Sequence, residues 1–524
     1  MNSSSEPGCR DPTERTGAAE AGEDGAESEA EASDRRDLVR GAGANYLGYV
    51  ARLGARAPFL FLAGILYGEA AFGLYTFGTA VVETGAALAL FGMKRSLSKV
   101  MSDAGGDTEG VLRATATGIV VAVGLGTLVT LAVAAGAGPI ALAFGLPGAA
   151  PALLVLSLAL PMIVLSDILL VAIRFTRQMR FEVYARSIVE PIVLTVSVVV
   201  AYALGVGDLG LVVGYVVALT SAALVTAVFF VRLYDVGSLV RIRLHWKDVK
   251  GLVTYTGPTA AYELAMLVAN RADVFLVSYF TRTSGVGIYG MAREFSTVTK
   301  KIRQGFDPIL RPVLSDSIAQ GALRRAKSQL VMVSRWILSS QIPVILVFVF
   351  YADDLLGLLG SGFAGGAVIL ILLMIGDAVE GGLGVNEIPI VYLRPRANIL
   401  IGILWIVANL GLGILLIPHL GPEGMAVAIV TALTLVNIAR VTVNRLHLGI
   451  DTLEGRILKP VAAALPPALA VWALNGALPP GASWSFALGL PLLLGGYVGT
   501  LYLLGLEPED RTQLRRLVSK VRGP

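Results

Sequence analysis

Long apolar segments alternate with short polar segments along most of the chain. From about residue 40 onward, apolar stretches recur that are long enough to cross the ~30 Å hydrocarbon core of a bilayer. They predict an all-α polytopic membrane protein with fourteen spans. The predicted spans are residues 40–66, 70–92, 111–135, 151–173, 187–204, 209–231, 252–279, 286–313, 329–351, 365–391, 398–417, 424–445, 457–477 and 485–505.

The charges in the connecting loops predict the orientation of these spans. Lys and Arg are concentrated in alternate loops and in the C-terminal tail, whereas the loops between them carry almost none, with Arg282 as the exception. Because cytoplasmic loops carry the excess of basic residues, both termini are predicted to be cytoplasmic. An even number of spans agrees with this orientation.

A repeat relates the two halves of the chain. The segment Gly73-Leu74-Tyr75 recurs further along as Gly287-Ile288-Tyr289. Two further landmarks recur at the same offset in residue number, Arg180 with Arg394 and Gly210 with Gly424. We call the step from Gly73 to Gly287 the repeat offset. In a hydrophobic chain, tandem halves of this size predict a transporter with two pseudo-symmetric six-helix lobes around a central cavity.

The repeat and the composition predict the domain organisation. The segment 1–34 is rich in acidic residues and poor in basic and apolar ones, so a disordered acidic cytoplasmic tail is predicted for residues 1–37. The remaining boundaries are an N-lobe at 38–231, a basic cytoplasmic linker at 232–251, a C-lobe at 252–445, spans thirteen and fourteen at 446–506, and a basic cytoplasmic tail at 507–524.

Composition argues against several classes of protein. Hydrophobic residues make up 55% of the chain and charged residues 15%, where a soluble protein carries about a quarter charged residues. The single cysteine, Cys9, permits no intrachain disulfide and no thiolate metal cluster. No phosphate-binding loop is present, and the predicted outer loops are too short to hold a glycosyltransferase site. We therefore expect no enzyme activity, no bound cofactor or metal, and no nucleic-acid partner.

Polar side chains form one stripe on the first helix of each predicted lobe. In span one, Asn45, Tyr49, Arg52 and Arg56 follow i, i+4, i+7, i+11 spacing, which places them on one helical face. The same positions shifted by the repeat offset are Thr259, Glu263, Met266 and Asn270, with Arg271 adjoining. Such a stripe predicts that the first helix of each lobe lines the cavity.

Span eight adds a second polar face. Its stripe consists of Arg293, Thr297, Lys300, Gln304, Asp307 and Arg311, opposite an apolar stripe. The alternative interpretation is an amphipathic helix on the cytoplasmic surface. Because guanidinium groups hold phosphate by paired hydrogen bonds, a cationic cavity suggests an anionic cargo. The candidate cargo contacts are Arg52, Arg56, Arg271, Arg293 and Lys300. Internal pairing competes with this role, for example Arg52 or Arg56 with Glu263, and Arg271 with Asp273 or Glu294.

Acidic residues inside the predicted membrane are candidates for ion coupling. Asp377, Glu380 and Glu387 share one face of span ten. They are interpreted either as salt-bridge partners of the cations in span eight or as a proton or sodium site. Glu83 in span two and Asp167 in span four are lone acids, interpreted either as ion-coupling residues or as carboxylates at a helix end or facing the cavity.

Three stretches resemble a known family. GILYGEAAFGLYTFGTAVVETGAALALFGMKRSL, VSYFTRTSGVGIYGMAREF and YLRPRANILIGILWIVANLGLGILLIPHLGPEGMAVAIV are similar to the polysaccharide and oligosaccharidyl-lipid branch of the MOP exporter superfamily. This resemblance, over residues 38–445, implies a V-shaped, MATE-like fold that works by alternating access. It also implies that Arg52 and Arg56 meet a pyrophosphate. The fourteen-helix layout resembles the lipid II flippases, in which the last two helices form a groove for the lipid tail.

The function implied by this resemblance is export of a lipid-linked glycan. The expected cargo is a polyprenyl-pyrophosphate-linked oligosaccharide, an O-antigen or exopolysaccharide repeat unit, carried to the outer leaflet of the bacterial cytoplasmic membrane. Expected partners are this cargo, membrane lipids and polysaccharide polymerase or assembly proteins, with Na⁺ or H⁺ as candidate coupling ions. The alternatives are a cation-coupled drug or metabolite antiporter of the same fold and a lipid II flippase.

Overall fold

The computed structural model describes residues 54–104, 107–176, 178, 180–477, 483–505 and 507. Within these residues the regular structure is helical and contains no strand, which confirms the predicted all-α class. The acidic tail and most of the basic C-terminal tail lie outside the described residues, as do Asn45, Tyr49 and Arg52.

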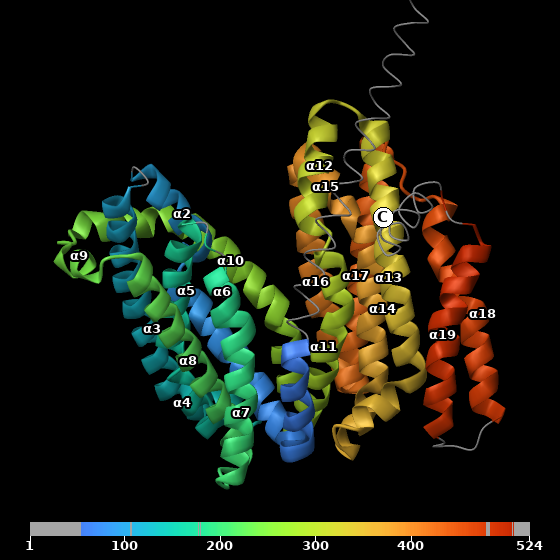
Figure 1. Cartoon of the computed structure of the whole chain (residues 1–524), viewed down its shortest axis with the longest axis horizontal. Coiled ribbons are helices and arrows are strands. Elements are labelled where there is room, and N and C mark those ends of the chain that lie inside the picture. Colours follow the sequence, from blue (N-terminus) through green and yellow to red (C-terminus); the bar gives the residue numbers. More distant parts are fainter. Residues whose placement is uncertain are drawn as a thin grey trace, which may run out of the picture.

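The helices form two bundles that approach each other at one end and diverge at the other, like the arms of a V (Figure 1). The first bundle contains a helical stretch at 54–90 and then α2 (Met93–Asp103), α3 (Thr108–Ala143), α4 (Ala149–Ser157), α5 (Leu160–Phe175), α6 (Arg180–Glu182), the π-helix η1 (Val183–Val189), α7 (Glu190–Ala203), η2 (Gly207–Leu209) and α8 (Gly210–Leu233). The short α9 (Val236–Arg241) leads toward the second bundle.

The second bundle repeats this plan. It contains α10 (Trp246–Phe280), α11 (Thr283–Gln304), α12 (Asp307–Ala319), α13 (Leu323–Gly357), η3 (Ser361–Gly366), α14 (Ala367–Leu383), η4 (Gly384–Asn386), α15 (Glu387–Leu393), α16 (Pro395–Leu420) and α17 (Pro422–His447). The long α10 contacts α2 and α3 of the first bundle as well as α11 and α16 of the second. One continuous helix therefore links the two lobes.

Helix ends reproduce the repeat offset that the sequence predicts. The step from the start of α2 at Met93 to the start of α12 at Asp307 equals the step from Gly73 to Gly287. The ends of α3 and α8 precede the ends of α13 and α17 by the same interval. The prediction of two pseudo-symmetric six-helix lobes is therefore confirmed at the level of individual helices.

Two predicted spans differ in detail. The stretch 54–90 covers the second half of predicted span one and nearly all of predicted span two. Gly68 within it has φ of 74°, a left-handed conformation that favours glycine. Predicted span eight, at 286–313, is wrong as a single helix, because α11 ends at Gln304 and α12 begins at Asp307. The residues of its polar stripe beyond Gln304 therefore belong to a separate element.

By length and apolar composition, eleven helices of the described range qualify as membrane spans. The first of them, Gly54–Asp103, includes residues 54–66 of predicted span one and all of predicted span two. The helices α10 and α11, which correspond to predicted spans seven and eight, are absent from this set. Multi-pass membrane insertion is thus supported, while the number fourteen stays a prediction.

The last two helices, α18 (Gly455–Ala477) and α19 (Ser483–Leu503), lie outside the repeat and pack on the outer flank of the second bundle (Figure 1). Both contact α13. The hydroxyl of Tyr351 on α13 donates a hydrogen bond to the Ser485 carbonyl oxygen at 2.9 Å. Gly489 leaves space for this ring, because an added Cβ would lie 1.8 Å from the Tyr351 hydroxyl oxygen.

Candidate functional site

A cavity of about 900 Å³ lies between the two lobes. The first lobe lines it from the 54–90 stretch, α2, α5, η1, α7 and α8, and the second lobe lines it from α10 and α11. Both helices that the polar stripes predicted to face the cavity do so, through Arg56 in the first lobe and Glu263, Met266 and Asn270 in the second. The exposed Lys94 and Arg95 mark its open end.

The two repeated glycines close the other end of the cavity. A Cβ added to Gly73 would lie 1.9 Å from the Thr283 carbonyl oxygen, and one added to Gly287 would lie 1.8 Å from the Glu69 carbonyl oxygen. Each glycine would also meet the backbone nitrogen of the other, at 2.9–3.0 Å. The lobes therefore touch backbone to backbone here. We call this contact the glycine seam, defined by Gly73 and Gly287.

Charges of both signs line the cavity in nearly equal number. Seven cationic and six acidic side chains face it: Arg56, Lys94, Arg95, Arg174, Arg186, Arg271 and Arg293, with Glu83, Asp167, Glu182, Glu190, Glu263 and Glu294. The described part of the cavity thus carries one more cation than acid, and three of the five predicted cargo contacts, Arg56, Arg271 and Arg293, line it. A low-dielectric wall makes an unpaired charge costly, so acids from neighbouring helices accompany the cations.

Two ion pairs between lining residues of the cavity cross from one lobe to the other. The Arg56 Nη2 atom lies 3.1 Å from Glu294 Oε1. Arg271 is paired with Glu83, which the sequence suggested as an ion-coupling residue. Internal pairing was the competing interpretation, and it holds for both arginines, although with other acids than those proposed. Glu83 is thus engaged by a guanidinium group in this conformation.

Arg293 is held by a buried partner behind the cavity wall. Its Nε atom lies 2.6 Å from Asp273 Oδ2, and its Nη2 atom donates to the Asn270 carbonyl oxygen at 3.0 Å. The Tyr289 hydroxyl donates to the same Asp273 oxygen at 2.8 Å. Asp273 is only 5% exposed, so this network fixes the guanidinium of Arg293 at the wall.

The first lobe contributes a charged network centred on Asp167, an acid that the sequence marked but whose two cationic partners it did not predict. Asp167 on α5 accepts from Lys94 Nζ at 3.3 Å and from Arg186 Nη2 at 2.8 Å. Arg186 also reaches Glu190 at 3.3 Å. Arg186 lies in the π-helix η1, an irregularity that is frequent at functional sites. The i, i+4 spacing of Arg186 and Glu190 is the one feature of the sequence that could have indicated this network. Charged pairs at this spacing are common on ordinary helices, however, so it does not single out a functional site.

The open end of the cavity is also bridged by ion pairs. The Arg95 Nε atom of α2 lies 2.9 Å from Glu263 Oε1 of α10, and its guanidinium lies 5.8 Å from the centroid of the Tyr262 ring. Arg174 lies 3.6 Å from Glu182. The loop cations that predict the orientation of the chain therefore also form the cavity mouth.

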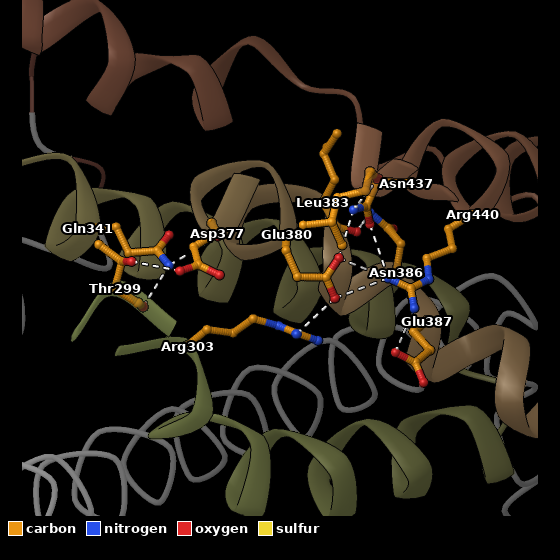
Figure 2. Close-up of polar contacts among 11 residues, drawn as sticks. Thr299, Arg303, Gln341, Asp377, Glu380, Leu383, Asn386, Glu387, Asn437 and Arg440 are labelled. Atoms are coloured by element: carbon orange, nitrogen blue, oxygen red, sulfur yellow. Dashed lines mark hydrogen bonds and ion pairs between the residues drawn. The ribbon is translucent and has the colours of Figure 1, made fainter. Parts of the chain in front are cut away.

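Lys300 does not line the cavity, contrary to expectation. It is exposed near the end of α11 and is close enough to Asp377 for an electrostatic interaction. The predicted ion-coupling residues Asp377, Glu380 and Glu387 likewise lie away from the cavity, inside the second lobe (Figure 2). Their position separates them from the six carboxylates of the cavity.

Two of these three acids are engaged by arginines. Glu380 Oε1 lies 2.8 Å from Arg303 Nη1, and Glu380 Oε2 lies 3.1 Å from Arg440 Nη1. Arg440 Nη2 also reaches Glu387 at 2.9 Å, and Asn437 donates to Glu380 at 2.7 Å (Figure 2). Glu380 and Glu387 thus serve as salt-bridge partners, one of the two interpretations of this face. The cations come from α11 and α17.

Asp377 has a different environment. Its Oδ2 atom accepts a hydrogen bond from the Thr299 hydroxyl at 2.9 Å, and Gln341 donates to the Thr299 and Asp377 carbonyl oxygens at 3.0 and 3.2 Å (Figure 2). Across the described ranges, no Lys or Arg nitrogen lies within ion-pair distance of its carboxylate. Among the three acids of α14 and α15, Asp377 is therefore the one free to exchange a proton or cation without breaking a salt bridge.

Comparisons with known proteins agree with this architecture. Residues 61–364 match the family described as polysaccharide biosynthesis protein, and this match covers more than half of the chain, so the chain belongs to that family. No curated protein matches the sequence. This match confirms the polysaccharide-biosynthesis part of the resemblance that the sequence shows.

Solved structures show the same fold at low sequence identity. The lipid II flippase MurJ in an inward closed conformation aligns with a TM-score of 0.65 and 14% identity, covering 90% of this chain and 100% of that chain. An inward-facing multidrug resistance MATE family transporter of the MOP superfamily aligns with a TM-score of 0.59 and 14% identity, covering 79% and 98%. The Vibrio cholerae MATE transporter VcmN in the bent form gives 0.51 and 14%, covering 80% and 97%.

Proposed function

We propose that this member of the polysaccharide biosynthesis protein family is a flippase for a polyprenyl-pyrophosphate-linked oligosaccharide. It would carry this cargo from the inner to the outer leaflet of the bacterial cytoplasmic membrane by alternating access. The observation that carries the proposal is the cavity between the lobes, which is lined by guanidinium groups from both lobes. Membership of a polysaccharide biosynthesis family supports a glycan as the cargo.

Exchange of ion pairs is the proposed binding step. Arg56 and Arg271 each hold a single carboxylate in this structure, Glu294 and Glu83 respectively. A pyrophosphate offers several oxygens with paired geometry, so it can replace a carboxylate at a guanidinium group. The displaced acids would then repel the cargo from below. This arrangement favours a site that binds the anion and also releases it.

The glycine seam sets the direction of access. The cavity opens at the end that carries the basic loops, which the positive-inside rule assigns to the cytoplasm. Outward opening requires Gly73 and Gly287 to separate and the end of the cavity that carries the basic loops to close. An inside-negative membrane potential assists outward movement of an anion by ~2.3 kcal/mol per charge per 100 mV.

Asp377 is the proposed ion-coupling residue. Glu83, Glu380 and Glu387 are held by arginines in this conformation, whereas Asp377 accepts from the Thr299 hydroxyl. A carboxylate inside a membrane lobe without a guanidinium partner is a typical proton or cation relay. Its position inside the second lobe separates coupling from cargo binding.

Mass spectrometry of polyprenyl-pyrophosphate-linked glycans tests the proposal. A deletion strain should accumulate a completed lipid-linked oligosaccharide and lose the surface polymer, and complementation should reverse both effects. Unchanged lipid-linked glycan in the deletion strain would refute it. Accumulation of lipid II instead of an oligosaccharide would assign the cargo to the lipid II alternative.

A drug or metabolite antiporter of the same fold is the second candidate. Its supporting observation is the six carboxylates that line the cavity beside the seven cations, because a carboxylate released from its ion pair can hold a cationic cargo. Drug sensitivity of the same deletion strain distinguishes the two functions. A gain in sensitivity with unchanged lipid-linked glycan would establish the antiporter.

A further inference from the structure

A second, smaller cavity lies between the start of α13 and the start of α18. It has a volume of about 190 Å³ and is lined by one face of α13, from Arg324 to Arg335, by Glu454 just before α18, and by Arg456 in the first turn of α18. Val331, Met332 and Arg335 are buried and form its floor, while Arg324 and Arg456 are exposed at its rim. None of these residues lines the cavity between the lobes.

Positive charge exceeds negative charge at this small cavity. Lys327 lies 2.9 Å from Glu454, and Arg456 shares the same acid at 3.8 Å. Arg324 makes no ion pair with any other residue that the structure describes. The lining therefore contains four cations, Arg324, Lys327, Arg335 and Arg456, against the single acid Glu454.

A neighbouring carboxylate shows what the site accepts. Glu507 lies 2.5 Å from Lys459, 3.7 Å from Arg456 and 3.9 Å from Arg335. Three cations from α13 and α18 thus converge on one oxyanion. With Arg335 left out of the count, four cations, Arg324, Lys327, Arg456 and Lys459, share the two acids Glu454 and Glu507 among the described residues. This surplus of positive charge favours an external anion.

The exposed surface of α18 beside the cavity indicates which kind of molecule carries this anion. Below the cavity, α18 exposes an apolar stripe that includes Leu458 at 64%, Val461 at 46% and Leu465 at 62%. These residues follow i, i+3, i+7 spacing and so share one face, which begins beside Arg456. A basic cavity with an apolar helix face beside it matches a molecule that has a phosphate at one end and acyl chains at the other.

We propose that this cavity binds the phosphate of an anionic membrane phospholipid, with its acyl chains along the exposed face of α18. Basic pockets between helices at the cytoplasmic side recognise such headgroups. Bound lipid would bridge α13 and α18 and so hold the two C-terminal helices on the second lobe. The inference does not depend on the proposed cargo, because the site is separate from the cavity between the lobes.

Native mass spectrometry of the full-length protein in detergent tests the proposal. The protein is titrated with phosphatidylglycerol, with phosphatidylcholine and with inorganic phosphate. The test variant is Arg324→Gln with Arg456→Gln, and the matched control is Arg394→Gln with Arg396→Gln, two exposed arginines at the turn before α16. Each basic residue near an anionic headgroup is worth about fivefold in affinity, so the test variant should bind phosphatidylglycerol about 30-fold more weakly.

The outcomes separate a specific site from general surface charge. A loss for phosphatidylglycerol in the test variant, with binding kept in the control variant, supports the lipid site. Equal losses in both variants, or no loss in the test variant, would overturn it. Inorganic phosphate that binds as tightly as the lipid would also overturn it, because the acyl chains would then contribute nothing.

Discussion

Replacing Gly287 with alanine should force the two lobes apart at the closed end of the cavity. The added Cβ would lie 1.8 Å from the Glu69 carbonyl oxygen and 2.9 Å from the Gly73 nitrogen. Both obstacles are backbone atoms, so no side-chain rotation can relieve the overlap. The clash exists only while the glycine seam is formed, and its cost therefore falls on this conformation alone.

The size of the effect follows from known costs of overpacking. An extra methyl group in a packed interior costs about 1–3 kcal/mol, and a backbone obstacle places this site in the upper half of that range. For a two-state equilibrium, about 2–3 kcal/mol corresponds to roughly 30- to 150-fold in population. Gly287→Ala should therefore shift the protein strongly toward the state in which this end is open.

Double electron–electron resonance between spin labels measures the shift. Labels are attached to cysteines introduced at the exposed positions Gly148 and Asp354, one on each lobe, in a Cys9→Ser background. Gly287→Ala should add a population with a longer distance. The matched control is Gly124→Ala on α3, where an added Cβ meets nothing within 4 Å.

The reasoning would be refuted by one clear result. If the distance distribution of Gly287→Ala matches that of the Gly124→Ala control, the seam does not restrain opening. A loss of folded protein would be visible as aggregation in size-exclusion chromatography. The reciprocal variant Gly73→Ala then provides a second measurement of the same contact, because its Cβ meets the Thr283 carbonyl oxygen at 1.9 Å.

Three further predictions concern the charged networks. Arg271→Ala should slow glycan export about 10- to 100-fold at normal protein level, because hydrogen bonds to charged groups contribute about 1.5–3 kcal/mol. Arg271→Lys should slow export less. Restoration of export in the double variant Arg271→Ala with Glu83→Ala would contradict a cargo contact. Arg440→Ala should destabilise the protein by about 3–5 kcal/mol, because Glu380 stays buried with one partner fewer; an unchanged melting temperature in detergent would contradict this. Asp377→Asn should abolish the dependence of export on an imposed proton or sodium gradient in proteoliposomes, and retained dependence would exclude Asp377 as the coupling residue.

Sequence periodicity predicts the elements and their repetition well. The repeat offset, inferred from short motifs such as Gly73 and Gly287, reappears in the starts of α2 and α12. In a bilayer each backbone group must be satisfied within its own helix, so apolar length alone defines a span. Span eight was the exception, because its polar face continued across the break at Gly305 and concealed the end of α11.

Partner choice among charged residues required the tertiary structure. The stripes on spans one and seven predicted which faces meet the cavity, and Arg56, Glu263 and Asn270 lie there. Arg56 and Glu294 lie in different lobes, however, and nothing in the local pattern distinguishes Glu294 from Glu263 as the partner. The same limit applies to Lys300, whose place in the polar stripe predicted a cavity position that it does not have.

The sequence by itself thus determined the all-helical class, the two lobes and the faces that carry charge, because these depend on apolar length, helical spacing and a constant offset. Only the tertiary structure decided which charges neutralise each other and where the lobes touch. Ion pairs and backbone contacts act over a few ångströms, and helices far apart in the chain supply both partners. The glycine seam illustrates both contributions: its two residues were marked by the repeat, while their contact arose from the approach of the lobes.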